Sequence, residues 1–525
     1  MPTLEIDGKQ VTVPDGANLI QAADQAGIEI PHYCYHPGLT VAGNCRMCLV
    51  EIEKMPKLQI ACNTRATEGM VVRTQVDRVK HAREAVLEFL LLNHPVDCPI
   101  CDQAGECKLQ DYYMDYDRQA SRIPVEEKVH KGKALDIGRI IMLDQERCIL
   151  CTRCVRFLDE VTHTGELGVF QRGNHCEIDI FPGKRVDNPY SGNVVDICPV
   201  GALTNKDFRF KARVWYLDHT PSLCTQCATG CNIDVHHRRG QVYRFRPREN
   251  DAVNKYWMCD EGRASFRQLH GERRLLQPMA RQADAWSAVT MDAAVDSVVG
   301  RLIQIRDGDG PERIGGLVSA HASNEEAHLF ARLFREGFPG ARCAGFAWSP
   351  ADGYHDDLLI DADKNPNSNG LRALGISLDA AEILRAAEAG ELKALVLWRS
   401  DLARSQGEEW LDRVVEKVEF TVVLDTDGHP TAEAADVLLP IATAVETTGT
   451  FTNRARRVQL ARQAFVAPGQ VREGWALLSQ LGRRVAGWDL HPSAQAVFEE
   501  IATQVPAFAG LDYGRIGLHG AELAS

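Results

Sequence analysis

The residues of this chain with the clearest capacity for chemistry are cysteines at short, repeated spacings. Fifteen of the 17 cysteines fall into four local sets, each with a Cys-x-x-Cys pair. The first set is Cys34, Cys45, Cys48 and Cys62; the second is His94, Cys98, Cys101 and Cys107; the third is Cys148, Cys151, Cys154 and Cys198; the fourth is Cys224, Cys227, Cys231 and Cys259. Cys176 and Cys343 remain outside, and we expect both to be structural thiols.

Metal ligation explains these cysteines better than disulfide bonding. Residues 1–10 contain no basic region followed by an apolar one, so we expect the chain to stay in the cytoplasm, where thiols are kept reduced. A Cys-x-x-Cys pair lets two thiolates face one metal centre while the intervening backbone amides point at sulfur. The four sets are therefore candidate metal sites.

The third set favours iron–sulfur ligation over zinc ligation. A structural zinc site usually pairs two Cys-x-x-Cys knuckles. Here Cys148, Cys151 and Cys154 place three thiolates within seven residues, and Cys198-Pro199 follows at a distance. This pattern matches the ligands of a [4Fe–4S] cluster, and because there is one run and one remote Cys-Pro, we assign Cys198 to the same cluster. A zinc-rich scaffold, which would be colourless, is the alternative.

His94 stands where the second set lacks a fourth cysteine. A lone histidine at a helix end more often caps the helix or lies on the surface, but a cluster iron needs a ligand. Neutral imidazole in place of a thiolate removes one negative charge from the cluster and shifts its potential, as in Rieske centres. We therefore predict that His94 is a ligand that tunes the second cluster.

The elements around the first set predict a β-grasp fold. Residues 3–13 suggest a hairpin around Asp7-Gly8, residues 17–27 a helix that ends at Gly27, and residues 28–30 a short strand. The cysteines then fall in a loop and at a strand edge, as in [2Fe–2S] ferredoxins. Ten residues separate Cys34 from Cys45, where the plant type has four, so a dedicated subfamily is implied.

The second set follows a predicted amphipathic helix over residues 79–95. Its pattern directs Val79, Val86, Phe89 and Leu90 toward a core, and Pro95 helps to end it. This arrangement brings His94 to the three cysteines.

The chain beyond about residue 275 is predicted to be α/β. Residues 312–319 resemble a strand and lead to Ser323-x-x-Glu326, a capping-box signature before a helix. Residues 392–400 and 419–426 are further candidates for buried strands, and together these segments indicate a doubly wound sheet. The basic stretch at residues 236–248 alternates like a hairpin, which disfavours its use as a nucleic-acid patch.

A β-grasp unit, a His-x3-Cys-x2-Cys-x5-Cys unit and a ferredoxin-like unit in this order resemble one family, the G subunit of NADH-quinone oxidoreductase, which is the large peripheral-arm subunit of respiratory complex I. The resemblance covers residues 1 to about 263. It implies a [2Fe–2S] cluster on the first set and [4Fe–4S] clusters on the second, with His94, and on the third. The fourth set, with its Cys259-x-x-Gly-Arg ending, resembles the cluster domain of molybdopterin oxidoreductases, and residues 435–459 resemble a later segment of those enzymes.

The resemblance implies a multidomain α+β and α/β chain with one [2Fe–2S] and three [4Fe–4S] clusters. The expected domains are a [2Fe–2S] ferredoxin at 1–78, a His(Cys)3 cluster unit at 79–118, a ferredoxin-like cluster unit at 119–216, a molybdopterin-oxidoreductase-type cluster domain at 217–274 and a shortened body at 275–525. No Gly-x-Gly-x-x-Gly follows a strand, so neither flavin nor NAD is expected. The body is shorter than a pterin-binding one, so molybdopterin is not expected either.

The favoured function is electron relay within NADH:quinone oxidoreductase, without a substrate site in this chain. By resemblance, the partners are the flavin- and NADH-binding subunit, a small [2Fe–2S] subunit and downstream subunits that carry clusters and reach quinone. The same relay in a soluble NAD-linked hydrogenase or an electron-bifurcating complex is one alternative. A molybdenum or tungsten formate dehydrogenase is another, with Cys343 the one candidate for its metal. An iron-only hydrogenase fails, because it needs four further cysteines and two remain.

Net charge and hydropathy limit what the protein can bind and whether it can cross a membrane. A net charge of −13 disfavours nucleic-acid binding, which depends on clustered lysine and arginine. No apolar run approaches the roughly 20 residues of a membrane span, so we expect a peripheral subunit on the cytoplasmic side of the inner (plasma) membrane that contacts it only through partners. Arg147, Arg153 and Arg156 flank the third set and either are solvated or offset the negative charge of the clusters.

Overall fold

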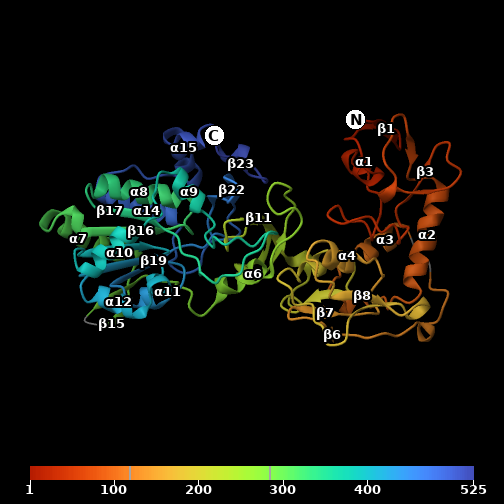
Figure 1. The fold of residues 1–525 in the computed structure, drawn as a ribbon, viewed down its shortest axis with the longest axis horizontal. Helices are drawn as coiled ribbons and strands as arrows, with labels where there is room; N and C mark the ends of the chain where they lie inside the picture. Colours follow the sequence, from red (N-terminus) through yellow and green to blue (C-terminus); the bar gives the residue numbers. More distant parts are fainter. Residues whose placement is uncertain (117–119, 283–284, 525) are drawn as a thin grey trace. The chain divides into compact units, whose positions relative to one another are not determined.

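The computed structural model describes residues 1–116, 120–282 and 285–524, and the chain forms two compact units, Met1–Leu217 and Asp218–Ser525 (Figure 1). Both units combine helices with sheets, which confirms the predicted multidomain mixture of α+β and α/β structure. Within the described ranges, no helix has both the length and the apolar character that crossing a membrane requires.

The first unit begins with a five-stranded sheet in the order β2-β1-β5-β3-β4. Asp7 and Gly8 have φ angles of 45° and 84°, the left-handed backbone that a tight hairpin turn needs. Helix α1 (Leu19–Gln25) begins with a capping box between Asn18 and Gln21. The strands are β1 (Thr3–Ile6), β2 (Lys9–Thr12), β3 (Leu49–Ile52), β4 (Gln59–Ile60) and β5 (Val71–Arg73). The strand predicted at residues 28–30 is wrong, because that segment joins no ladder and the sheet instead takes β3, after the cysteine loop.

Helix α2 (Asp77–Leu91) confirms the predicted helix but corrects its buried face. Val79, Arg83 and Leu87 are buried, and these positions repeat at intervals of four along one side. Phe89, predicted to face the core, is 75% exposed because it lies on another side of the helix. An arginine therefore occupies the centre of the buried face.

The rest of the first unit consists of short elements around the second and third cysteine sets. A three-stranded sheet has the order β10-β7-β6, and β8 pairs with β9. The elements are α3 (Lys108–Tyr116), β6 (Leu135–Asp136), β7 (Ile141–Leu143), α4 (Arg153–Glu160), β8 (Leu167–Phe170), β9 (Glu177–Ile180), α5 (Asn193–Asp196) and β10 (Leu203–Asn205), with 3-10 turns at Ala61–Asn63, Cys98–Ile100, Val125–Glu127, Gly173–His175 and Val214–Tyr216.

The second unit starts with a three-stranded antiparallel sheet that carries the fourth cysteine set. Its strands are β11 (Asp218–Leu223), β12 (Asn232–Arg238) and β13 (Gln241–Pro247). The last two form the hairpin predicted at residues 236–248, with Arg239 and Gly240 in the turn. Helix α6 (Asp260–Ala264) begins at Cys259.

The body of the second unit is a doubly wound α/β fold, as predicted. Its sheet has the order β15-β14-β20-β19-β18-β16-β17, and the five strands from β20 to β17 are parallel. The strands are β14 (Met279–Gln282), β15 (Ala285–Ala288), β16 (Ile314–Ser319), β17 (Arg342–Phe346), β18 (Ala394–Trp398), β19 (Phe420–Asp425) and β20 (Val437–Pro440). The strand order reverses between β16 and β18, which is where ligands bind in such sheets.

Helices cover both faces of this sheet and enclose two cores (Figure 1). One face packs against α7 (Met291–Gly308), α8 (Asn324–Gly337), α14 (Gly474–Ala486) and α15 (Ala494–Gln504). The other packs against α10 (Ala381–Ala389), α11 (Leu402–Gln406), α12 (Glu408–Val415) and α13 (Pro430–Glu433). Helix α8 begins with the predicted capping box of Ser323 and Glu326. The remaining elements are α9 (Ser368–Ala373), α16 (Tyr513–Ile516), β21 (Gly449–Thr452), β22 (Arg457–Ala461) and β23 (Ala521–Glu522), with 3-10 turns at Ser265–His270, Pro311–Arg313 and Pro506–Phe508.

Candidate metal centres

The four cysteines of the first set meet beside the β-grasp sheet. Cys34 and Cys45 lie on the loop after α1, Cys48 just before β3 and Cys62 in the 3-10 turn after β4. The Cys34 thiol contacts those of Cys45 and Cys62, and Cys62 also contacts Cys48. Hydrogen bonding from these neighbours holds the pKa of the Cys34 thiol below its ordinary value. The structure therefore brings all four predicted ligands of this set together.

The second set lies where the chain leaves α2. Burial lowers the pKa of His94 to about 4, so its imidazole is neutral at physiological pH, the form that binds metals. Its Nδ1 atom is buried and has no hydrogen-bond partner. Lys128 donates from Nζ to the carbonyl oxygens of Leu91 (2.9 Å) and His94 (2.6 Å), which fixes the backbone on both sides of the helix end.

Cys101 and Cys107 of the same set are buried, and Cys98 is half-buried at the start of a 3-10 turn. A Cβ on Gly201 would lie 2.3 Å from the Cys101 sulfur, so a side chain there would displace that sulfur. The His94 Nδ1 atom has no partner, and the Cys101 sulfur tolerates no side chain beside it. Both features fit a group held between these residues.

The third set surrounds a small cavity of about 20 Å³ at the start of α4. Cys148, Cys151, Cys154 and Cys198 all line it, together with apolar side chains that include Leu143 and Ile178. Burial raises the pKa of Cys148 to about 12 and that of Cys151 to about 11. Metal ligation requires thiolates, so binding at this set would release protons.

The fourth set is buried between the β11–β12 connection and α6. The amide of Cys224 donates to the carbonyl of Cys231 at 2.8 Å, and the amide of Gly262 donates to the Cys259 sulfur at 3.3 Å. A Cβ on Gly262 would lie 2.9 Å from the Cys224 sulfur. The glycine of the Cys-x-x-Gly-Arg ending is thus required by the close approach of two sulfurs.

Strained backbone marks three of the four sets. Arg46, Val96, Leu150 and Thr152 have φ angles between 52° and 60°, and each lies between the ligands of one set. Such angles are uncommon for side chains other than glycine, above all for the β-branched Val96 and Thr152. Conformations of this kind persist at sites where surrounding structure imposes them.

The first three sets share one buried core. A single cluster of packed side chains contains Cys34 and Cys45 of the first set, Cys107 of the second, and Cys148, Cys151 and Cys198 of the third. Tyr33, Met47, Leu87 and Tyr112 fill the space among them. Three cysteine sets that lie far apart in sequence therefore meet in one apolar region of the first unit.

The three arginines near the third set are engaged rather than solvated. Arg147 is buried and donates from Nε (3.0 Å) and Nη2 (2.6 Å) to the carboxylate of Asp97, beside the second set. Arg153 and Arg156 reach from α4 to carbonyl oxygens of the first-set loop. Burial lowers the pKa of Arg153, and the neighbouring thiols of the first and third sets oppose that effect.

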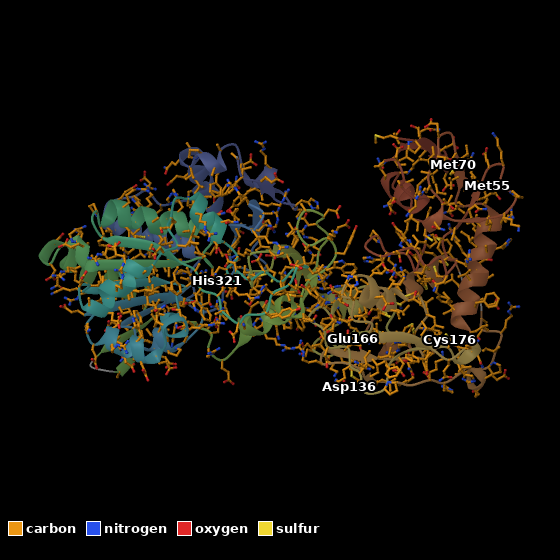
Figure 2. All side chains as sticks on the ribbon, viewed as in Figure 1. Met55, Met70, Asp136, Glu166, Cys176 and His321 are labelled. Carbon is orange, nitrogen blue, oxygen red and sulfur yellow. The ribbon has the colours of Figure 1, made fainter. Side chains whose placement is uncertain are left out.

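Within the described residues, no group of three or more histidine, cysteine, aspartate or glutamate side chains lies close enough to hold a single metal ion, so the four sets are candidates for multi-iron clusters and not for one ion. Cys176 comes just before β9 in the first unit (Figure 2), and Cys343 lies on β17. Burial raises the pKa of Cys343 to about 12. Cys343 is half-buried and its thiol is protonated at physiological pH; its structural role stays a prediction.

A larger cavity of about 350 Å³ opens at the carboxyl ends of β16, β18 and β19, next to the fourth set. Cys224 lines it together with His321, Arg399, Asp425 and Asp427; Figure 2 labels His321. Sequence analysis missed this cavity, although polar residues directly after buried strands were a signal for it.

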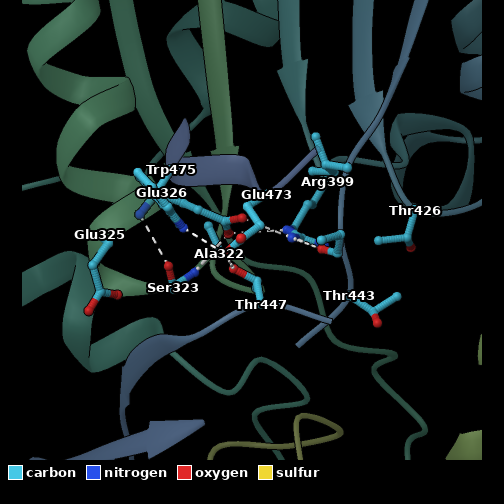
Figure 3. A network of polar contacts seen from close by, with 12 residues as sticks. Ala322, Ser323, Glu325, Glu326, Arg399, Thr426, Thr443, Thr447, Glu473 and Trp475 are labelled. Carbon is cyan, nitrogen blue, oxygen red and sulfur yellow. Dashed lines mark hydrogen bonds and ion pairs between the residues drawn. The ribbon is translucent and has the colours of Figure 1, made fainter. Parts of the chain in front are cut away.

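A buried ion pair and several hydrogen bonds lie at and behind the wall of this cavity (Figure 3). Glu326 accepts from Arg399 at 2.9 Å, and Arg399 also donates to the carbonyl of Ala442 at 2.7 Å. Glu473 accepts from Thr447 at 2.7 Å and from the Trp475 indole at 2.8 Å. Part of its wall is thus a polar network within the second unit.

Comparison with known families reproduces the order of these sites. Five family models match successive segments of the chain: "2Fe-2S iron-sulfur cluster binding domain" at 1–77, "NADH-ubiquinone oxidoreductase-G iron-sulfur binding region" at 83–122, "NADH-quinone oxidoreductase subunit 3, ferredoxin-like domain" at 138–204, "Molybdopterin oxidoreductase Fe4S4 domain" at 217–271 and "Molybdopterin oxidoreductase" at 367–484.

Individual relatives show the same similarity to subunits of NADH oxidoreductases. The G subunit of NADH-quinone oxidoreductase from Rickettsia conorii is 40% identical over 336 residues, which is 64% of this chain and 49% of that protein. The mitochondrial NADH-ubiquinone oxidoreductase 78 kDa subunit of Neurospora crassa is 44% identical over 295 residues, 56% of this chain and 40% of that protein. Over these stretches the chain is similar to the large iron–sulfur subunit of NADH-quinone oxidoreductase.

The match to this large iron–sulfur subunit is partial in length, since the chain spans about half of the curated relatives it matches. Its iron–sulfur domains are of both the 2Fe–2S and the 4Fe–4S type, as predicted. Among solved structures, an NAD+-reducing [NiFe]-hydrogenase in its H2-reduced state is similar with a TM-score of 0.37 and 29% identity, over 41% of this chain and 91% of that one.

Proposed function

We propose that this chain is an iron–sulfur electron-relay subunit of an NADH:quinone oxidoreductase. One observation carries the proposal: three cysteine sets pack around a single buried core in a chain homologous to the large iron–sulfur subunit of that complex. A relay needs several redox sites within one apolar matrix, because the surrounding shell controls solvent access and hence potential.

The proposed ligands are the four sets. Cys34, Cys45, Cys48 and Cys62 would hold a [2Fe–2S] cluster; His94, Cys98, Cys101 and Cys107, then Cys148, Cys151, Cys154 and Cys198, then Cys224, Cys227, Cys231 and Cys259 would each hold a [4Fe–4S] cluster. When bound, such clusters supply one-electron chemistry at potentials from about −700 to +450 mV.

The polypeptide would contribute orientation, hydrogen bonds and exclusion of water. Backbone amides already point at sulfur in three sets: Cys34 toward Cys45 (3.4 Å), Leu150 toward Cys148 (3.4 Å) and Gly262 toward Cys259 (3.3 Å). Hydrogen bonds to sulfur and solvent exposure are among the factors that set cluster potentials. The neutral imidazole of His94 would contribute one negative charge fewer than a thiolate at the second site.

The partners and the location in the cell are part of the proposal, and the similarity to G subunits of NADH-quinone oxidoreductase supports them. A flavin-bearing subunit would oxidise NADH, a small [2Fe–2S] subunit would lie beside it, and further subunits would pass electrons to quinone. We place the chain peripherally, on the cytoplasmic side of the inner (plasma) membrane, with membrane contact through partners only. The five domains expected from the sequence are part of the proposal as well. The boundary between residues 118 and 119 falls outside the described residues.

We further propose that the second unit carries no molybdopterin. The acidic Glu261, Asp425 and Asp427 line the cavity beside the fourth set. Of its two arginines, Arg399 is paired with Glu326 and Arg404 lies over the Trp348 ring at 4.8 Å. Such walls do not fit a phosphate-rich cofactor. Cys343, which the formate dehydrogenase alternative needs as a metal ligand, is not among the described residues that line it.

The test is metal and sulfide analysis of the anaerobically purified chain, with electron paramagnetic resonance during stepwise reduction. About 14 iron atoms and a [2Fe–2S] signal beside [4Fe–4S] signals are expected, from two irons at one site and four at each of three. Cys48→Ser should remove about two irons and Cys154→Ser about four, whereas Cys343→Ser, the matched control, should remove none. Zinc without acid-labile sulfide would refute the proposal, and stoichiometric molybdenum or tungsten would refute the claim about the cavity.

A further inference from the structure

Arg83 is an arginine at the centre of a hydrophobic helix face. Its side chain is completely buried, between Val79 and Leu87 on the inward side of α2. Arginine is almost never fully buried unless it is paired. The partners of this guanidinium therefore determine whether its burial is structural or functional.

The rest of the polypeptide offers the Arg83 guanidinium few hydrogen-bond or charge partners. Its Nη2 atom donates to the carbonyl of Leu49 at 3.4 Å, while Nε and Nη1 are buried without a hydrogen-bond partner. The guanidinium lies 5.1 Å from the ring centre of Tyr116. Among the described residues, no carboxylate forms an ion pair with it. Asp7, the nearest candidate by charge, is already bonded to the amide and hydroxyl of Thr74.

An unpaired buried charge is too unfavourable to persist without compensation. Removing a cation from water carries a large penalty that only a nearby anion with good geometry repays. Deprotonation cannot remove this penalty, because arginine stays charged in proteins. Tyr116 offers the guanidinium a ring face and a hydroxyl, but neither carries a charge, so a negative group bound close to Arg83 would complete the compensation.

The first cysteine set is where that negative group would be. Leu49, whose carbonyl Arg83 contacts, directly follows Cys48, and the Cys48 thiol is close enough to act on the guanidinium. Four thiolates around two irons and bridging sulfides form an anionic site. Reduction adds one electron and no proton, so a fixed positive charge nearby stabilises the reduced form more than the oxidised form.

We propose that Arg83 is the buried counter-charge of the first cluster and raises its reduction potential. The inference rests on the proposed [2Fe–2S] cluster at Cys34, Cys45, Cys48 and Cys62. It adds a residue outside the ligand sets that helps to determine how readily this site accepts an electron.

The experiment compares midpoint potentials of the [2Fe–2S] signal in the full, cluster-loaded chain. Arg83→Met removes the charge but keeps most of the volume. We expect a lower potential, with at least a tenfold fall in the ratio of reduced to oxidised cluster at fixed ambient potential, or 59 mV for a one-electron couple. Arg83→Lys should shift less. Arg78→Met is the matched control: Arg78 lies on the same helix but is 51% exposed, so its loss should change the ratio less than threefold.

Each possible result of this experiment either supports the role proposed for Arg83 or overturns it. An assembled cluster with unchanged potential in Arg83→Met overturns it, because packing alone would then explain the arginine. If Arg83→Met and Arg83→Gln both fail to assemble the first cluster while Arg83→Lys succeeds, the positive charge itself is required and the inference stands; if Arg83→Lys also fails, it falls. Absence of the [2Fe–2S] signal from the unmodified chain would instead refute the proposed function.

Discussion

The guanidinium of Arg156 donates from Nη2 to the backbone carbonyl of Cys34. Helix α4, which carries Cys154 of the third set, is thereby bonded to the loop that carries Cys34 and Cys45 of the first. Arg153, three residues earlier, donates to the carbonyl of Tyr35 and, at 3.2 Å, to that of Ile197, next to Cys198. Two arginines thus connect the first and third cysteine sets through backbone carbonyls.

Replacing His94 by cysteine should keep a cluster at the second site but change its properties. A thiolate adds one negative charge in place of a neutral ligand, so the reduction potential should fall and the magnetic signature should change. The measurement is electron paramagnetic resonance during stepwise reduction. His130→Cys, which alters an exposed histidine paired with Glu146, is the control and should leave all signals in place. An unchanged spectrum in His94→Cys would remove this histidine from the ligands.

Gly262→Ala should disrupt the fourth site alone. The added Cβ would lie 2.9 Å from the Cys224 sulfur and 3.4 Å from that of Cys259, closer than side chains pack, so the sulfurs must separate. We expect a loss of about four irons per chain, measured with acid-labile sulfide.

The control for this change is Gly300→Ala in α7, where no atom lies within 4 Å of the added Cβ. It should retain all iron and stabilise the helix by up to about 1 kcal/mol. Unchanged iron content in Gly262→Ala would contradict the tight approach of Gly262 to the Cys224 and Cys259 sulfurs.

Glu326→Gln should destabilise the second unit by roughly 3–5 kcal/mol, because it leaves the charge of Arg399 buried without its ion partner. Glutamine can still accept from the Ser323 amide, so the helix cap survives. Urea unfolding followed by tryptophan fluorescence would measure the loss, since Trp398 and Trp475 lie in this unit.

The double variant Glu326→Gln with Arg399→Met should recover part of that loss, because it removes the stranded charge as well. If the two single losses simply add in the double variant, the buried pair is not coupled as the structure indicates.

Glu325 should make the stability of the second unit depend on pH. Burial raises its pKa to about 7, although the Thr450 amide (2.8 Å) and the Tyr513 hydroxyl (2.9 Å) donate to its carboxylate. The folded state thus binds a proton that the unfolded state, near pKa 4.5, has already released. The resulting stability is present below about pH 4.5 and is lost as pH rises through about 7, on the order of 3 kcal/mol in all.

Glu325→Gln cannot titrate, so the difference in melting temperature between the variant and the unmodified chain should move in favour of the variant from pH 5.5 to pH 8. Glu382→Gln, at a carboxylate that is 76% exposed, should show no such trend. A constant difference for Glu325→Gln would place the pKa of this carboxyl near its ordinary value.

Local patterns predicted much of the fold because local interactions decide it. The Asp7-Gly8 turn, the capping box of Ser323 with Glu326 and the apolar runs that form β16, β18 and β19 all follow from residues that are close in sequence. The strand at 28–30 and the inward side of α2 were predicted wrongly, because ladder pairing and the choice of buried face depend on segments far away in sequence.

The sequence alone determined which side chains are candidate ligands, since Cys-x-x-Cys spacing is a property of the chain and its chemistry follows from residue type. Only the tertiary structure decided that three of the sets share one core, that the His94 Nδ1 atom is left without a partner and that an arginine lies buried beside Cys48. These facts depend on long-range packing, in which burial removes water and leaves each charge or polar atom to the partners that the fold brings near it.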